Sequence, residues 1–245
     1  MLSPRLWLAP IALFALQASP VLVATDSAGQ IRLTFGGGLG EYQERLVSCS
    51  GETLDQYDVR YQQVGGQMDV WIKPKLRVTG YGGAMFSHTD RPVAQQFESL
   101  YQGGYGGALV AGEWRVVGAG AGLSLMPGDP QTSGGTAIHP AAYLRLGHKE
   151  KAHFRMDLFG PPGAAAPPQG GRIGVGFGQG NLRKIGGFVG FGIAPFPRSD
   201  NQGAIVGDLL VPATRALDVG GTFAGSGSGF TMGVMVRMSL GRPPK

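Results

Sequence analysis

Apolar side chains recur at every second position in many segments of this chain, which is the spacing of a β-strand with two unlike faces. The segment from Phe230 to Leu240 is the clearest, because every even position is apolar while Thr231, Gly233 and Arg237 stand on the other face. Each such segment is predicted to be a strand. The same alternation is found at residues 31–40, 76–81, 142–146, 153–158, 173–177, 189–193 and 217–223.

The connections between these segments alternate in length, and this alternation predicts the number of strands. Five short polar breaks and six longer stretches delimit about twelve strands, with ten as the alternative. The predicted fold is therefore all-β: a closed, antiparallel, up-and-down barrel with both chain ends at one rim. The short breaks lie at 73–75, 112–113, 147–151, 179–184 and 212–215, and the longer stretches at 42–53, 87–98, 127–136, 160–170, 195–202 and 225–229.

Two segments do not follow the simple alternation. The apolar positions are odd from Tyr57 to Tyr61 but even from Met68 to Ile72, which predicts a bulge or bend near residues 62–66, or a hairpin there that changes the strand count. In the second segment, Arg115 shares its face with the apolar residues that follow it. Either Arg115 lies at the edge of the barrel or the strand is bulged.

The first residues have the layout of an export signal. Arg5 precedes an apolar stretch over residues 6–16, and the chain then becomes more polar, passes Pro20 and reaches the small residue Ala24. This layout predicts a secretory signal peptide over residues 1–24, with an uncleaved helical anchor as the alternative. Residues 25–245 are then predicted to form a single barrel domain.

The composition suits a curved sheet better than a helical domain. The chain has 44 glycines, and only 15% of its residues are charged. Glycine is poor in helices and tolerable in curved, closed sheets. The net charge of +5 comes without a Lys/Arg block, so no nucleic-acid partner is predicted. Glycine-rich segments mimic a dinucleotide fingerprint, but no helical pattern follows them, so no cofactor is predicted.

The residues on the polar face of the strands indicate whether the apolar face points outward, as in a membrane barrel, or inward, as in a soluble one. A membrane barrel turns its apolar face to lipid and hides charged residues and glycines in the lumen. A soluble barrel does the opposite, and a secreted soluble binding protein is the alternative. The export signal and the many glycines on the polar face favour a transmembrane barrel.

From these features the chain resembles the small outer-membrane β-barrel proteins of Gram-negative bacteria. Its last strand is similar to their assembly signal, carried here by Thr231, Gly233, Val236 and Met238, although it is followed by residues 241–245 instead of ending on an aromatic residue. The resemblance implies export through the periplasm and insertion among outer-membrane lipids by the barrel-assembly machinery. No oligomeric state is predicted.

The first functional hypothesis is a passive, porin-like pore for small solutes. The excess of arginine over aspartate in its lumen would mildly favour anions. The alternative is a structural barrel that does not conduct, because the same charges pair with one another and plug the lumen. The candidate lumen-facing residues are Arg32, Arg60, Asp69, Arg77, Arg145, Arg155, Asp157 and Arg237.

Catalysis and metal binding find little support in the sequence. A lipid enzyme of the outer leaflet would need the region around His88, where Ser87 and Asp90 are neighbours. Adjacent side chains in an extended segment point apart, so no triad and no catalytic residue are predicted. His148 and His153 flank one hairpin without a third ligand of matching spacing, so no metal site is predicted.

Aromatic residues cluster near the predicted strand ends. This placement predicts a girdle at the membrane interface, with sheet packing as the alternative for each residue. The residues concerned are Tyr42, Tyr57, Tyr61, Trp71, Tyr81, Tyr101, Tyr105, Trp114 and Phe159.

Overall fold

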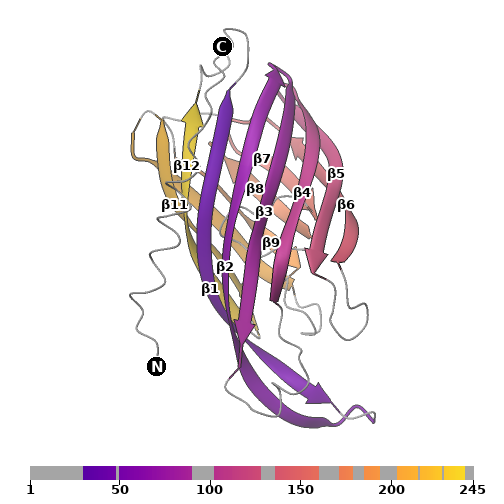
Figure 1. The fold of residues 1–245 in the computed structure, drawn as a ribbon. Coiled ribbons are helices and arrows are strands. Elements are labelled where there is room, and N and C mark those ends of the chain that lie inside the picture. Colours follow the sequence, from indigo (N-terminus) through magenta and orange to yellow (C-terminus); the bar gives the residue numbers. More distant parts are fainter. Residues whose placement is uncertain are drawn as a thin grey trace.

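The computed structural model shows a closed barrel of twelve antiparallel strands (Figure 1). It describes residues 30–47, 50–89, 102–127, 136–159, 171–178, 185–193, 203–214, 216–227 and 229–240. The predicted signal peptide, residues 1–24, lies outside the described residues. The strands are β1 (Ile31–Val47), β2 (Thr53–Lys73), β3 (Leu76–His88), β4 (Gln102–Glu113), β5 (Val117–Pro127), β6 (Thr136–Leu146), β7 (His153–Leu158), β8 (Gly171–Phe177), β9 (Gly186–Ile193), β10 (Gly203–Pro212), β11 (Leu217–Ser226) and β12 (Gly229–Leu240).

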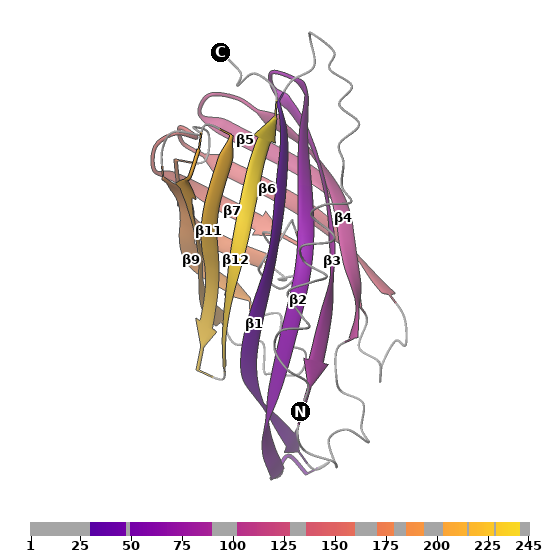
Figure 2. The same ribbon diagram turned by 60° about the vertical axis from the view of Figure 1, so that its left-hand side comes forward.

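Each strand pairs with its neighbours in sequence, and β1 pairs with β12 to close the barrel. Figure 2 shows β12 and β1 side by side at this closure. The prediction of an up-and-down barrel with twelve strands is confirmed, and the ten-stranded alternative is wrong. The five connections that follow β2, β4, β6, β8 and β10 lie at one end, here called the turn rim, and the six that follow the odd-numbered strands lie at the other, the loop rim.

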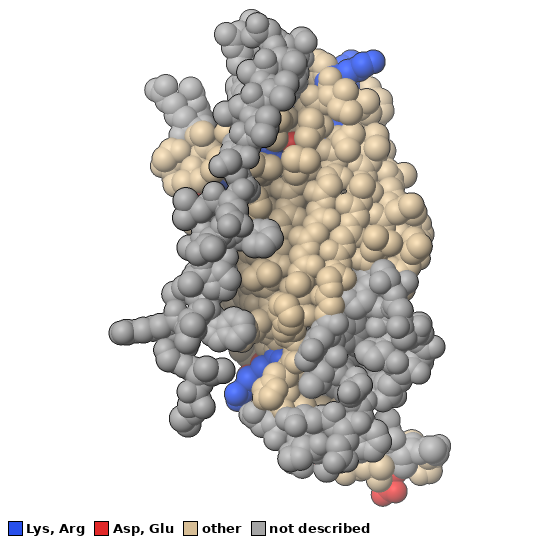
Figure 3. Space-filling model, in the orientation of Figure 1, with Lys and Arg blue, Asp and Glu red and all other residues tan. Residues whose placement is uncertain are grey.

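The alternation along each strand separates an apolar outer wall from a more polar interior. On β12, Val234 is 71% exposed, and Met232 and Val236 on the same face are exposed too, whereas Thr231 and Arg237 are buried inside. In Figure 3 the wall between the two rims carries no broad charged patch where it is not covered by grey atoms. Among the described residues, no helix has the length and apolar character needed to cross a membrane.

Strand β2 explains the first irregular segment of the sequence without a bulge near residues 62–66. Its odd positions face the interior along the whole strand, from Tyr57 to Trp71. What changes is the polarity of the outer face, which is polar from Gln56 to Gln62 and apolar from Val64 onward. The β1–β2 hairpin projects beyond the other strands at the loop rim (Figure 1). The parity switch therefore marks the edge of the apolar wall.

The second irregular segment has a simpler explanation. Arg115 lies in the turn between β4 and β5, because β5 begins only at Val117. Its side chain is exposed at the turn rim. The strand therefore needs no bulge to keep this charge away from the apolar wall.

Most of the predicted aromatic girdle is wrong, because these rings face the interior. Tyr42, Tyr57, Tyr61, Trp71, Tyr81 and Tyr105 are buried, and Trp114 is exposed in a turn. Several rings lie over a glycine of the neighbouring strand, where a Cβ atom would collide with them: Tyr61 covers Gly40, Tyr81 covers Gly107 and Tyr105 covers Gly83. Tyr101 lies outside the described residues.

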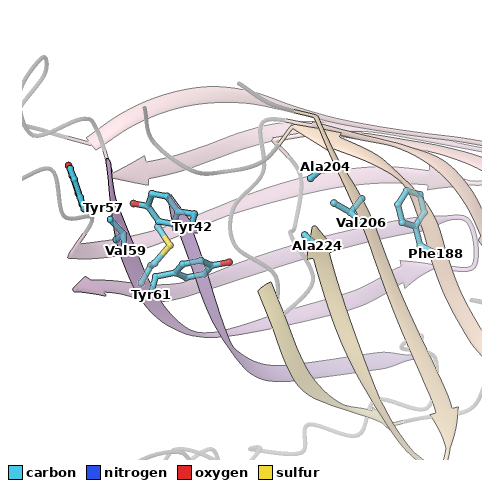
Figure 4. Close-up of a cluster of buried hydrophobic side chains, with 9 residues drawn as sticks. Tyr42, Tyr57, Val59, Tyr61, Phe188, Ala204, Val206 and Ala224 are labelled. Carbon is cyan, nitrogen blue, oxygen red and sulfur yellow. The ribbon is translucent and has the colours of Figure 1, made fainter. Parts of the chain in front are cut away.

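The projecting hairpin has an apolar inner face. Figure 4 shows Tyr42, Tyr57, Val59 and Tyr61 together at that end of the barrel, and the rings of Tyr42 and Tyr61 are 6.2 Å apart. The inner face is therefore apolar and aromatic toward the loop rim. The charged interior residues lie nearer the turn rim.

Candidate functional site: the charged belt inside the barrel

Of the residues that the structure describes, eleven charged side chains line the interior of the barrel in its turn-rim half, and we call this set the charged belt. Their side chains, apart from Arg32, are between 2% and 15% exposed in the pairs that they form, and Arg32 is buried as well. Buried charges are stable when they are paired and hydrogen-bonded. The belt consists of Arg32, Arg77, Arg145, Arg155, Arg172 and Arg237 together with Asp69, Glu113, Asp157, Asp208 and Asp218.

Arg145 connects two turns of the turn rim. Its Nη2 atom lies 3.2 Å from Glu113 Oε2 and donates to the carbonyl of Trp114 at 2.7 Å, while Nη1 donates to the carbonyl of Gly147. Glu113, Gly118 and Arg145 are register partners in a row across β4, β5 and β6. A Cβ atom on Gly118 would lie 2.7 Å from Glu113 Oε2, so the glycine leaves room for this ion pair.

Arg77 joins β3 to strands on both sides. Its guanidinium lies 3.7 Å from Asp69 Oδ1 and 3.3 Å from Glu113 Oε1. It also lies 5.2 Å from the ring of Tyr143 on β6, within the range of a cation–π contact. The hydroxyl of Thr79 donates to Asp69 at 2.6 Å and holds that carboxylate in place.

On the other side of the barrel, Arg172 bridges β7 and β10. Its Nε atom donates to Asp157 at 2.8 Å, and its Nη1 atom donates to Asp208 at 3.2 Å. The guanidinium passes over the ring of Phe188 on the intervening strand β9, 4.7 Å from its centroid. Arg155 shares the carboxylate of Asp157 at 2.9 Å. Next to the barrel closure, Arg237 on β12 pairs with Asp218 on β11 at 2.6 Å.

Phe159 turns into the barrel directly after β7. Its φ of 44° is in the left-handed region, and its ring stacks on His139 of β6 at 4.4 Å. The hydroxyl of Tyr81 on β3 donates to the carbonyl of Phe159 at 3.0 Å. The hydrogen bond from Tyr81 passes over β5, whose inward positions are small: Gly118, Gly120, Gly122 and Ser124.

The belt lines a partly open cavity of about 130 Å³ in the barrel interior. Six arginines and Lys149 line it, against three carboxylates, Asp69, Glu113 and Asp208. Asp157 and Asp218, at 3% and 1% exposure, lie against the wall and do not line the cavity. The cavity lining therefore has an excess of four positive charges.

Seven of the eight predicted lumen residues are members of the belt, and one is not. Arg60 lies on the outward face of the projecting hairpin, with its side chain 68% exposed and 3.8 Å from Glu41. The apolar positions Tyr57, Val59 and Tyr61 predict a lumen-facing Arg60 only if they face lipid, but these three side chains face the interior. Four belt members are not among those eight residues: Glu113, Arg172, Asp208 and Asp218. Arg172 continues the polar parity of β8, and that signal could have identified it.

The other candidate residues are scattered. Ser87 is buried inside, whereas His88 is exposed on the outer face, so the hydroxyl and the imidazole do not meet. Asp90 lies outside the described residues. Within the described ranges, no three His, Cys, Asp or Glu side chains are grouped as metal ligands. In the proposed assembly signal, Thr231 faces inward, and Val236 and Met238 face outward.

The fold and the site define a closed twelve-stranded antiparallel barrel with an apolar outer wall and a charged interior. No protein-family model and no curated sequence relative matches the chain. The β-domain of the Bordetella autotransporter Brka aligns with 88% of this chain and 100% of its own length, at 15% identity and a TM-score of 0.44.

Two porin structures also align with the chain. A variant of the Rh. blastica porin covers 86% of this chain and 100% of its own length, at 9% identity and a TM-score of 0.32. Pseudomonas putida OprB aligns with 84% of this chain and 92% of its own length, at 11% identity and a TM-score of 0.24. These values are too low to assign a family or a function.

Proposed function

We propose that the chain is an outer-membrane β-barrel protein with a narrow, hydrated lumen that passes water and small ions passively. Its partners are then the lipids around the wall and the machinery that inserts the barrel, which would use the Thr231–Met238 strand as its signal. The observation that carries the pore proposal is the charge-lined cavity of about 130 Å³ inside the turn-rim half.

The outer wall supports the membrane location. Along the outer face of β2, Asp58 and Arg60 precede Val64 and Met68, so polar residues give way to apolar ones within one strand. A soluble protein seldom exposes a continuous apolar wall, because its contact with water is unfavourable. A lipid-facing band bounded by polar strand ends accounts for both features.

The interior supports a hydrated and narrow passage. A cavity needs roughly 15 Å³ of this volume to hold one water molecule, so the cavity lined by the belt has room for several. Its walls supply many hydrogen-bonding groups, which water requires. Arg77 reaches Tyr143 over β4 and β5, and Arg172 reaches Asp208 over β9, so both side chains narrow the lumen.

A second candidate, a structural barrel without conductance, is favoured by the pairing within the belt. Asp157 forms ion pairs with both Arg155 and Arg172. Glu113 forms ion pairs with both Arg77 and Arg145. A fixed network of this kind stiffens the wall and could close the lumen. The two candidates differ in whether ions cross the barrel.

Ion current in planar bilayers tests the pore directly. We expect the purified protein to give a small, steady current. Arg77→Ala should increase the current, because it removes a lumen side chain that reaches over β4 and β5 to Tyr143. Arg60→Ala removes the same charge outside the lumen and should leave the current unchanged. Absence of current in both the wild type and correctly folded Arg77→Ala would contradict the pore and favour the structural role.

A further inference from the structure

We propose that the cavity inside the charged belt is a binding site for a small multivalent oxyanion of the phosphate type. This inference rests on the proposed barrel function and adds a ligand class to it. The lining has seven cationic side chains and three carboxylates. An anion that enters the cavity therefore meets an unbalanced positive field.

The pairing pattern explains why the positive charge is concentrated on the cavity. Asp157 and Asp218 are drawn against the wall by Arg155, Arg172 and Arg237, at 2.6–2.9 Å. These carboxylates pair with the three arginines but do not line the cavity, whereas the arginines do. Even when both are counted, positive charges still exceed negative ones by two. A divalent anion would balance this excess.

The geometry of the cations suits an oxyanion. Guanidinium groups present several N–H donors in one plane and bind phosphate or carboxylate oxygens with two parallel hydrogen bonds. Arg32 and Arg237 approach the cavity from β1 and β12, and Arg77 and Arg155 from β3 and β7. Lys149 adds an ammonium group from the β6–β7 turn. Donors thus converge from several sides.

Trp71 offers a reporter inside the site. Its ring lines the cavity, with the guanidinium of Arg32 4.9 Å and that of Arg77 5.9 Å from its centroid. An anion that binds these arginines changes the electric field at the ring. Trp114 lies exposed in a turn, so Trp114→Phe gives a background in which Trp71 is the tryptophan of the barrel wall.

The test is a titration of the detergent-solubilised Trp114→Phe protein with inorganic phosphate at pH 8, with ionic strength held constant by sodium chloride. We expect a saturable change in Trp71 emission that acetate does not reproduce. Arg32→Gln and Lys149→Gln should each raise the half-saturating phosphate concentration about tenfold, the loss expected for one charge-assisted hydrogen bond. Arg60→Gln, which removes a positive charge outside the barrel, should not change it.

The outcomes separate the ligand site from the pore. Saturable phosphate binding without ion current would refute the pore and leave the site intact. Ion current without saturable binding would refute the site, and so would equal half-saturation in Arg60→Gln, Arg32→Gln and Lys149→Gln. Lys149 lies in a turn outside the strands, so Lys149→Gln keeps the test decisive if Arg32→Gln does not fold.

Discussion

Arg145→Ala is expected to lower the free energy of unfolding of the barrel by about 3 to 5 kcal/mol, the usual cost of removing one partner of a buried ion pair. Arg145 is 2% exposed and joins Glu113 to the carbonyls of Trp114 and Gly147. The substitution leaves a buried carboxylate with less compensation and releases two turns. Urea unfolding of the detergent-solubilised barrel measures the loss.

Two further variants make this result interpretable. Arg145→Lys keeps the charge but cannot reach all three acceptors, so its loss should be intermediate. Arg60→Ala removes an exposed arginine whose ion pair with Glu41 is solvent-screened, and it should be close to the wild type. If Arg145→Ala and Arg60→Ala have the same midpoint in urea, the belt does not hold the turn rim together.

Val234→Arg is expected to destabilise the barrel folded in lipid by roughly 2 to 4 kcal/mol, the cost of an arginine near the bilayer midplane. Val234 is 71% exposed at the middle of β12, where it pairs with Gly37 and Gly221. Unfolding of the barrel from phospholipid vesicles measures this cost.

Leu54→Arg is the matched control for the lipid-facing substitution. Leu54 is also an exposed aliphatic residue on the outer face, but it lies near the tip of the projecting hairpin, beyond the apolar wall. Its replacement should have little effect on stability. Equal effects of the two substitutions would mean that the wall around Val234 does not face hydrocarbon.

The strands and their order could be predicted because a period of two is a strong local signal. In β12, every outward position is apolar, and the alternation alone places Arg237 inside. The β1–β2 hairpin could not be predicted in the same way. Beyond the apolar wall, the outer face becomes polar and the inner face carries Tyr57 and Tyr61, so the hydrophobic parity inverts although the strand continues.

The aromatic residues show a second limit of sequence patterns. A tyrosine near a strand end suits a membrane interface as well as it suits an interior face over a glycine. The positions of Tyr61 over Gly40 and Tyr81 over Gly107 depend on strand register, which the sequence does not display.

The sequence pattern predicts most of the residues of the charged belt, but it does not predict which of them form ion pairs. Alternation identifies most of the inward charges, including Asp69 and Arg155. The ion pairs Arg145–Glu113 and Arg172–Asp208 each span an intervening strand, β5 or β9. Such contacts require the curvature of the closed barrel and the small or flat side chain that lies between the partners. Neither is visible in a linear pattern.

The most direct test of the membrane-barrel account is the heat-modifiable migration of the protein in isolated outer membranes. The account predicts that the protein sediments with these membranes and that its unboiled form migrates as a compact, fast band in detergent gels. Boiling should convert this band to a slower one, because the closed sheet unfolds. Recovery in the soluble periplasmic fraction, with no change of mobility on boiling, would contradict the lipid-facing wall.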